Sequence, residues 1–420
     1  MPNLNELRRQ FAQLKNENLN LDMTRGKPSE AQLDLSKPLL SILKEDDYLS
    51  PSGVDCRNYS SPDLLTGLPE LKQLFADVFE LDKDQIIIGG NASLNLMSDI
   101  IHYAFQKALP GAKKPWNKNE KIKFICPSPG YDRHFGICEA LGIEMLSVPL
   151  TGFGPDMDLV EKLVNEDETI KGIWCVPKYS NPTGETYSKD TVKRLVSMKP
   201  KADDFRIFWD NAYALHHLSD HQDSLVNILK LATEMNNPNC VFMFASTSKI
   251  TFAGSGIAFV ASNKENVNWI VENLKYQTIG FDKLNQLRHL IFFKTKENVI
   301  KHMQHHARIL KPKFDAVLKI LEKELGTDGQ FATWTYPKGG YFISLNTKAN
   351  LAKKVVSMAE TLGVKLTKAG ATFPYAKDPL DQNIRIAPSM PTVSDIMKAS
   401  EALALCIQIA TIEANESVMN

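Results

Sequence analysis

The stretch from Cys240 to Val260 constrains this chain most, because it places a lone lysine directly after an apolar run. Residues 241–244 are β-forming side chains, and residues 257–260 form a second such run after a glycine-containing turn. The pattern predicts strand, turn and strand, with Lys249 where the first strand ends. Burial at a strand end favours the neutral amine, the form that makes an imine with an aldehyde. Taken alone, a lysine in such a place is more often an ordinary solvated side chain.

The length and the net charge of the chain limit the classes of protein to which it can belong. The 420 residues are 43% hydrophobic, enough for two or three domains or for one large α/β domain with a satellite. The formal net charge is zero, whereas a nucleic-acid or membrane-surface partner would leave a basic excess. The first twenty residues lack the apolar core of a signal peptide, and no later run is long enough to span a bilayer. Six scattered cysteines suggest buried reduced thiols, so we expect a cytoplasmic protein. From the charge and the lack of long apolar runs we expect no nucleic-acid or membrane partner.

Strands and helical patterns alternate over residues 86–260, which predicts an α/β fold with a mainly parallel sheet covered on both faces. A smaller α+β unit is expected toward the C-terminus. Ligands of parallel sheets bind at the carboxyl ends of the strands. Polar residues fall at those predicted ends: Tyr131, Asn181, Asp210, Tyr213, Ser246 and Lys249.

A glycine pair after the apolar residues 86–88 leads into a predicted helix. The backbone N–H groups of Asn91, Ala92 and Ser93 would lie unpaired at the helix start, where the helix dipole favours an anion. This is a candidate phosphate seat. A capped helix start without a ligand explains the motif equally well.

Two further features have alternative explanations. Arg385 lies inside an apolar strand pattern, and a buried arginine needs a partner, either a substrate carboxylate or an internal Asp or Glu. His302, His305 and His306 share a helical face, but without a carboxylate or cysteine pattern we expect a solvated face and no metal site.

Taken as one pocket, the strand-end residues match the needs of pyridoxal 5'-phosphate. Lys249 would form the imine, and Asp210 would keep the ring nitrogen protonated. Asn181 and Tyr213 can hydrogen-bond a ring hydroxyl, and Tyr131 offers a flat face for stacking. The phosphate would be held by the start of the helix together with two hydroxyls, those of Ser246 and Ser248.

Four motifs then resemble the fold-type I, class I/II aminotransferases, in order and in rough spacing: Ser-Asn-Pro-Thr-Gly at 180–184, Asp-Asn-Ala-Tyr at 210–213, Ser-Thr-Ser-Lys at 246–249 and Arg-Ile-Ala-Pro-Ser at 385–389. The resemblance covers essentially the whole chain. The Thr-Arg-Gly-Lys-Pro segment from Thr24 and the Pro-Gly-Tyr-Asp-Arg-His-Phe segment from Pro129 are similar to a bacterial aspartate-aminotransferase-like subgroup. The resemblance implies the fold-type I architecture of pyridoxal-phosphate transferases. We expect residues 51–300 to form the large cofactor-binding domain, and residues 1–50 and 301–420 to form the small domain.

The same resemblance implies roles for individual residues. Lys249 would bond to the cofactor and move the proton, with Asp210 and Tyr213 as the other catalytic groups. Arg385 would hold the substrate α-carboxylate, with Asn181 and Gly26 beside it. Tyr59 matches a tyrosine that reaches the phosphate of the neighbouring subunit, so a homodimer with shared active sites is implied.

One position departs from the family pattern. Relatives carry a phosphate-binding arginine seven or eight residues after the lysine, where this chain has Gly256 and Ile257. We therefore expect Ser246, Ser248 and the helix-start amides to hold the phosphate, with or without another basic residue.

The predicted function is transfer of an amino group from an L-amino acid to a 2-oxo acid such as 2-oxoglutarate, by a ping-pong mechanism. Arg25 or Lys27 could hold a distal carboxylate, which favours aspartate or another acidic donor. Two alternatives are a lyase on the same fold and a non-catalytic amino-acid-sensing domain. Arg385 argues against decarboxylation, and the short N-terminal segment leaves no room for a DNA-binding module.

Overall fold

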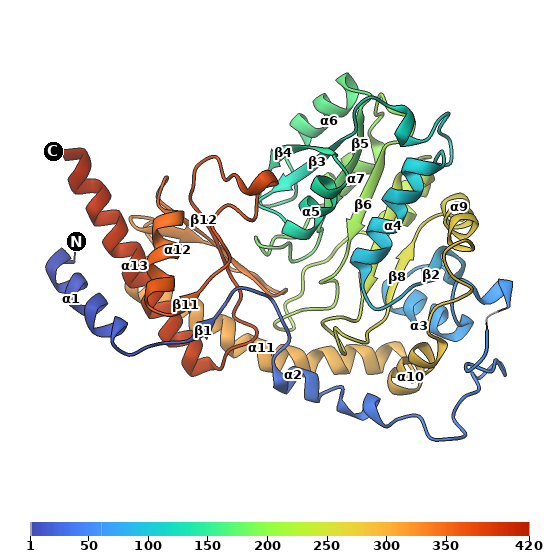
Figure 1. Cartoon of the computed structure of the whole chain (residues 1–420), viewed down its shortest axis with the longest axis horizontal. Helices are drawn as coiled ribbons and strands as arrows, with labels where there is room; N and C mark the ends of the chain where they lie inside the picture. The colour runs from blue at the N-terminus through green and yellow to red at the C-terminus, as the bar shows by residue number, and fades with distance from the viewer. Residues whose placement is uncertain (1, 60, 420) are drawn as a thin grey trace.

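A seven-stranded sheet forms the centre of the computed structural model, which describes residues 2–59 and 61–419 (Figure 1). The strand order is β2-β8-β7-β6-β5-β3-β4. The strands are β2 (Ile86–Ile88), β3 (Lys123–Ser128), β4 (Glu144–Pro149), β5 (Ile170–Cys175), β6 (Arg206–Asp210), β7 (Val241–Ser246) and β8 (Ala258–Ala261). Only β8 runs antiparallel to its neighbours within this described sheet. The predicted α/β class with a mainly parallel sheet is confirmed.

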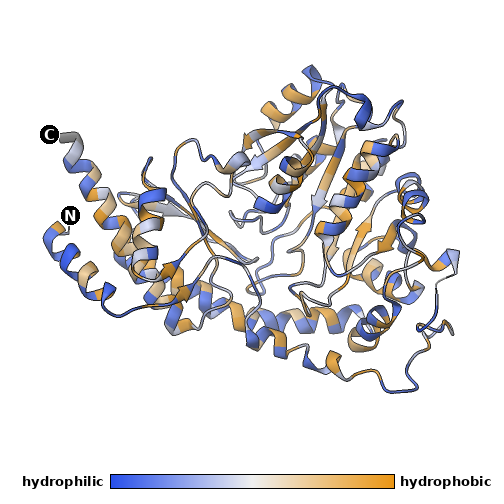
Figure 2. Ribbon diagram, in the orientation of Figure 1, coloured by the Kyte–Doolittle hydropathy of each residue, from blue (hydrophilic) through white to orange (hydrophobic). Residues whose placement is uncertain are grey.

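Helices cover both faces of the sheet, which explains why its central strands β5 and β7 are mostly apolar and buried along almost their whole length (Figure 2). Phe208, Phe242 and Phe244 pack on one face, whereas Trp209 and Met243 pack on the other, as the two-residue period of a strand requires. The helices of this part are α3 (Pro69–Phe79), α4 (Ser93–Gln106), α5 (Asp132–Ala140), α6 (Met157–Glu166), α7 (Lys189–Ser197), α8 (Ile228–Glu234), α9 (Lys264–Leu274) and α10 (Lys283–Phe293).

A smaller unit combines the two ends of the chain. Its antiparallel sheet has the order β12-β10-β9, and β1 pairs in parallel with β11. The elements are α1 (Leu4–Lys15), β1 (Leu21–Asp22), β9 (Ala332–Trp334), β10 (Ile343–Thr347), α12 (Ala352–Thr361), β11 (Val364–Lys365), β12 (Asn383–Ile386) and α13 (Val393–Met419). Leu21 lies opposite Val364, so the N-terminal segment contacts the C-terminal part. The exact domain limits stay a prediction.

The long helix α11 (Lys296–Leu325) runs beneath both units, and the short α2 (Glu30–Asp34) lies against it (Figure 1). The sequence suggested one continuous helical region from Lys264 to Leu325, but the structure has three helices there. The chain breaks before α10, and again at Lys294, whose φ of +62° is incompatible with a right-handed helix. No helix in the described residues has the length and apolar character needed to cross a membrane.

Candidate active site

The carboxyl ends of β3, β5, β6 and β7 meet at one edge of the sheet, where they bring the candidate residues together. Tyr131 and Asn181 follow β3 and β5, whereas Asp210 and Ser246 are the last residues of β6 and β7. Parallel pairing makes this convergence obligatory, because neighbouring parallel strands end on the same side. The small unit adds Arg385 from β12.

Asp210 is buried and oriented by a histidine that the sequence did not single out. His134 Nε2 donates to Asp210 Oδ2 over 3.0 Å, and the His134 ring stacks on Trp174 at 4.3 Å with an interplanar angle of 9°. The second carboxylate oxygen, Oδ1, is buried without a hydrogen-bond partner among the described residues. A buried orphan acceptor is costly, so this oxygen is suited to a donor such as a protonated ring nitrogen.

Lys249 lies among aromatic rings beside that carboxylate. Its Nζ is 5.0 Å from the centre of the Tyr213 ring and 5.9 Å from that of Tyr341. Burial lowers the pKa of Lys249; the Asp210 charge opposes this shift and the Arg385 charge adds to it. The environment therefore moves Lys249 toward the neutral amine that the sequence argument required.

A set of buried side chains holds the backbone that follows Lys249. His302 Nε2 and His306 Nε2 lie 2.8 and 2.9 Å from the carbonyl oxygen of Ile250. The expectation of a solvated histidine face was wrong for these two, which are 8% and 1% exposed. Burial lowers the pKa of both, that of His306 to about 3, so both are neutral at neutral pH. Among the described residues no group has the composition of a metal site.

Arg385 is anchored on several sides and still has a free donor. Its Nη1 donates to Asp132 Oδ1 at 3.1 Å and to Asn181 Oδ1 at 3.3 Å, and its Nη2 donates to Thr367 Oγ1 at 3.2 Å. The Nε–H is buried and has no partner in the described part of the chain. The internal carboxylate that the sequence left open therefore exists, as Asp132, but it does not saturate the guanidinium.

Gly26 lies against the same arginine through an aromatic ring. A Cβ at Gly26 would come within 2.6 Å of the Phe342 ring, and that ring lies 4.9 Å from the Arg385 guanidinium carbon. The carbonyl of Thr24 also accepts from Arg385 Nη2 at 3.4 Å. The segment around Gly26 thus lies beside Arg385, and a larger residue there would displace Phe342.

The candidate phosphate seat is formed by the segment after β7 and the segment before α4, which are hydrogen-bonded to each other. Ser246 Oγ donates to Ser248 Oγ at 3.1 Å, and Ser248 Oγ donates to the Asn91 carbonyl at 3.1 Å. The Asn91 side chain reaches back to the carbonyl of Ala253. Ala92 caps α4 and Ser93 is its first residue, so the free N–H groups of this fourteen-residue helix start at the seat.

The structure explains why the usual arginine is absent after Lys249. A Cβ at Gly256 would lie 2.8 Å from the Phe252 carbonyl oxygen and 2.9 Å from Thr247 Oγ1, so no side chain fits. Ile257 is 2% exposed, and its N–H donates to Thr247 Oγ1 at 2.9 Å. Neither position can present a long cation to the seat.

Tyr59 stands apart from the other candidates. Its side chain is 81% exposed, on the loop that precedes α3. The role implied for it, contact with a neighbouring subunit, stays a prediction. A large exposed aromatic side chain is compatible with that role.

Two site residues were missed by the reasoning from sequence. Asp132 and His134 both belong to the Pro-Gly-Tyr-Asp-Arg-His-Phe segment, and both follow a predicted strand end. The helix α5 begins at Asp132 after its N-cap Tyr131, and His134 lies three residues, about one turn, after that cap. That spacing was the available signal, but their partners Arg385 and Asp210 come from distant elements.

Comparison with known proteins agrees with this geometry. A family model described as aspartate amino-transferase matches residues 2–418. A putative aminotransferase of Mycolicibacterium smegmatis is 48% identical over 408 residues, which cover 97% of this chain and 94% of that protein.

Solved structures agree as well. The crystal structure of an aspartate transaminase from Corynebacterium glutamicum superposes with a TM-score of 0.95 at 42% identity, covering 98% of this chain and 96% of that one. LysN, the α-aminoadipate aminotransferase of Thermus thermophilus, shares the fold with a TM-score of 0.76 at 19% identity, over 97% and 95% of the two chains. The predicted resemblance is thereby confirmed, and the chain is an aminotransferase that belongs to the aspartate amino-transferase family.

Proposed function

We propose that the chain binds pyridoxal 5'-phosphate at the edge formed by β3, β5, β6 and β7, and that it transfers amino groups from acidic L-amino acids. The observation that carries the proposal is the pairing of Lys249 with Asp210. One is a lysine whose pKa is lowered by burial, and the other a carboxylate with a buried oxygen that lacks a partner among the described residues. When bound, the cofactor supplies a ring that accepts electrons from the substrate carbon.

The residues then have distinct proposed tasks. Asp210, oriented by His134, would accept a hydrogen bond from the protonated ring nitrogen and keep it protonated, and Asn181 and Tyr213 would hydrogen-bond the ring oxygen. Tyr131 covers the ring, with its own ring 4.9 Å from His134. Burial raises the pKa of Tyr131 to about 12 and also raises that of Tyr213 well above its usual value, so both remain neutral hydrogen-bond donors.

Lys249 has two proposed tasks at one atom. Its neutral Nζ would hold the cofactor through the aldehyde group, and once displaced by the incoming amine the same Nζ would be the base that moves the substrate α-proton. Arg385 holds the substrate carboxylate, with its unpartnered Nε–H as the available donor. The phosphate is held by Ser246, Ser248 and the α4 start, without an arginine from positions 256 and 257.

The preference for acidic donors rests on two exposed cations. Arg25 and Lys27 flank Gly26, and the same segment contacts Arg385 through the Thr24 carbonyl. A second substrate carboxylate, a few carbon atoms from the first, would meet positive charge there. The relative from Corynebacterium glutamicum is an aspartate transaminase, which supports the same donor class.

We further propose a homodimer in which Tyr59 reaches the phosphate of the neighbouring subunit, and a cytoplasmic location. The exposure of Tyr59 supports the first proposal. The six cysteines support the second, since all are free and buried, as in a reducing compartment.

Two experiments test the central proposal. Lys249→Ala should abolish both the imine absorbance of the loaded protein and its turnover; retained turnover contradicts the assignment. A screen of amino donors against 2-oxoglutarate should give aspartate or glutamate the highest kcat/KM. Replacing Arg25 and Lys27 by Ala, singly and together, should raise KM for acidic donors and leave neutral donors unaffected. An unchanged preference would contradict the role of these cations while leaving the aminotransferase assignment intact.

A further inference from the structure

A large cavity lies on the other side of the sheet from the candidate active site. Its volume is about 860 Å³, within the range of ligand sites. Trp209 and Met243 line it, whereas Asp210 and Phe244, one residue further on, face the opposite way. None of the candidate active-site residues lines this cavity.

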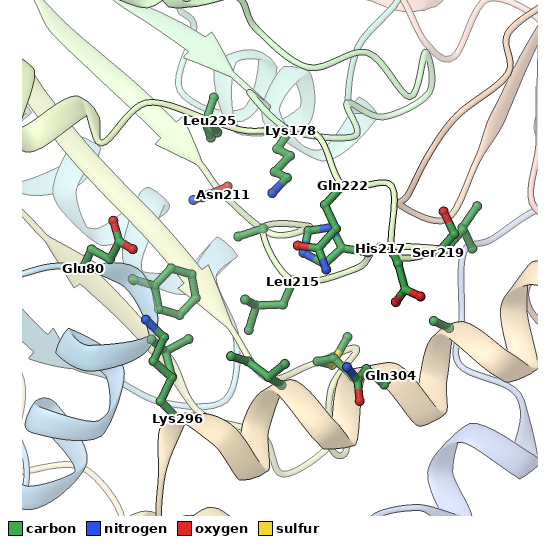
Figure 3. A pocket seen from close by; sticks show the side chains of 18 of the residues that line it. Glu80, Lys178, Asn211, Leu215, His217, Ser219, Gln222, Leu225, Lys296 and Gln304 are labelled. Carbon is green, nitrogen blue, oxygen red and sulfur yellow. The ribbon is translucent and has the colours of Figure 1, made fainter.

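The cavity contains a buried lysine without a partner. Lys178 is 9% exposed, and in the described chain no hydrogen bond or ion pair engages its amino group, whose contact is the Tyr179 ring at 5.4 Å. Figure 3 shows its side chain extending from its loop into the open space, with Asn211 beside it. Burial lowers the pKa of Lys178 to about 8, against an opposing effect of Asp223. A bound anion would relieve the cost of this charge.

The nearby carboxylate that could neutralise Lys178 is held by other residues. Asp223 Oδ1 accepts from Lys338 Nζ at 2.9 Å, and Asp223 Oδ2 accepts from Thr186 Oγ1 at 2.9 Å. Its backbone N–H donates to Tyr179 Oη at 3.2 Å. Both oxygens are thus engaged by other groups, and among the described residues no hydrogen bond or ion pair joins Asp223 to Lys178.

The wall beside Lys178 is rigid. Tyr179 has a φ of +52°, in the left-handed region that tyrosine rarely adopts, and it is 1% exposed. A Cβ at Gly339 would come within 2.2 Å of its ring, so the tyrosine is closely packed there. Its hydroxyl lies 2.7 Å from His217 Nδ1. The fixed backbone of Tyr179 holds the main chain at Lys178 in place, at the edge of the cavity, before any ligand arrives.

A second polar group and an apolar chamber complete the cavity. Asn211 is 8% exposed, and its Oδ1 is buried without a hydrogen-bond partner among the described residues. About half of the cavity wall is apolar, including Leu215, Leu225 and Met303, and the rest is polar. The lining has four cations, Lys178, Lys296, Arg308 and Lys311, against the acids Glu80 and Asp220.

We propose that this cavity is a second ligand site, which binds a small organic acid with one carboxylate and an apolar body. The carboxylate pairs with Lys178 Nζ and accepts from the side-chain N–H group (Nδ2) of Asn211, and the apolar body fills the chamber against α11. Lys296, which rises from α11 across the cavity, adds attraction for the anion (Figure 3). A bare inorganic anion would leave the apolar walls in water and is therefore a poorer match.

Calorimetric titration tests the proposal with two probes of equal shape, 4-phenylbutanoate and the neutral 4-phenylbutan-1-ol. The holoenzyme carries Arg385→Ala in all titrations, so that the carboxylate anchor of the active site does not contribute. The acid should bind at least about tenfold more tightly than the alcohol, since a charge-assisted hydrogen bond separates them. Lys178→Met should weaken binding of the acid by roughly ten- to hundredfold and leave the alcohol unchanged.

Two controls keep the result interpretable. Lys178→Met removes an unpaired buried charge, so its melting temperature should equal or exceed that of the parent, and weaker binding cannot come from unfolding. Lys311→Met removes an exposed cation of the rim, already paired with Asp315, and should change the affinity less than about twofold. Equal affinity of Lys178→Met and the parent for the acid would overturn the proposal. Failure of both probes to bind would overturn it as well.

Discussion

Asp132 accepts a hydrogen bond from Arg385, the arginine that we assign to the substrate carboxylate. Removing the charge of Asp132 therefore tests that assignment. Asp132 Oδ1 lies 3.1 Å from Arg385 Nη1. A substrate carboxylate that binds Arg385 must share the guanidinium with this aspartate or displace it. Asp132→Asn keeps the side-chain shape and removes the charge. We expect a lower KM for the amino donor and for the 2-oxo acid alike, because both carry the same α-carboxylate.

The magnitude follows from the exposure of the two partners. Arg385 is 6% exposed, but the Asp132 side chain is 37% exposed, so water screens the pair. Such a pair is worth about 1 kcal/mol, which corresponds to about a fivefold fall in KM. The Asp132–Arg385 pair exists in the free enzyme, and it is weakened to the same extent in the substrate complex and in the transition state. The value of kcat should therefore change little.

Steady-state kinetics of both half-reactions measure this effect. Asp158→Asn is the matched control, because Asp158 also lies in the first turn of a helix and contacts an arginine, Arg194, at 2.6 Å. That pair joins α6 to α7 and includes none of the candidate site residues, so its loss should leave KM unchanged. A KM that stays constant or rises in Asp132→Asn would refute the idea that Asp132 competes with the substrate.

Three further predictions concern stability. Gly363→Ala places a Cβ 1.8 Å from the Leu19 carbonyl oxygen at a φ of +81°, and should lower the free energy of unfolding by roughly 2–4 kcal/mol in urea titrations; an unaltered midpoint would contradict close docking of the N-terminal segment. Asp204→Ala leaves Lys171, paired at 2.6 Å, as a buried lone charge and should cost about 3–5 kcal/mol in the same assay, whereas a cost below about 1 kcal/mol would show that water reaches the pair. Burial raises the pKa of Glu185 from 4.5 to about 7, so its protonated form stabilises the fold and this contribution is lost as pH rises through that range. In thermal unfolding Glu185→Gln should match the parent below pH 4.5 and exceed it above pH 7, and a constant difference would refute the titration.

The main candidate residues could be predicted because parallel strands end at one edge. Asp210 and Lys249 follow two apolar runs in the sequence, and the sheet geometry alone then places them together. The absence of the phosphate-binding arginine was also visible in the sequence. Its cause was not, because the contact of Gly256 with Thr247 and Phe252 depends on the turn conformation.

Pairings between distant elements could not be predicted. His302 and His306 looked like solvent-facing residues, yet both turn inward to the Ile250 carbonyl, which is at least 52 residues away in the sequence. The unpaired state of Lys178 depends on Asp223, which is engaged by Lys338 over a separation of 115 residues. Local periodicity has no information on such partners, since it reports only which face of an element is apolar.

Arg385 shows how the two explanations of a buried charge are connected. The sequence offered either a substrate carboxylate or an internal acid, and the structure contains the internal acid. A buried arginine without any carboxylate would destabilise the free enzyme, whereas one fully saturated by an internal carboxylate would have no donor left for substrate. Asp132 takes one Nη1 contact from a partly exposed position, and the Nε–H has no partner among the described residues. The partial pairing with Asp132 compensates the buried guanidinium charge in the free enzyme and leaves donors of Arg385 for the substrate. We therefore expect removal of the Asp132 charge to strengthen substrate binding.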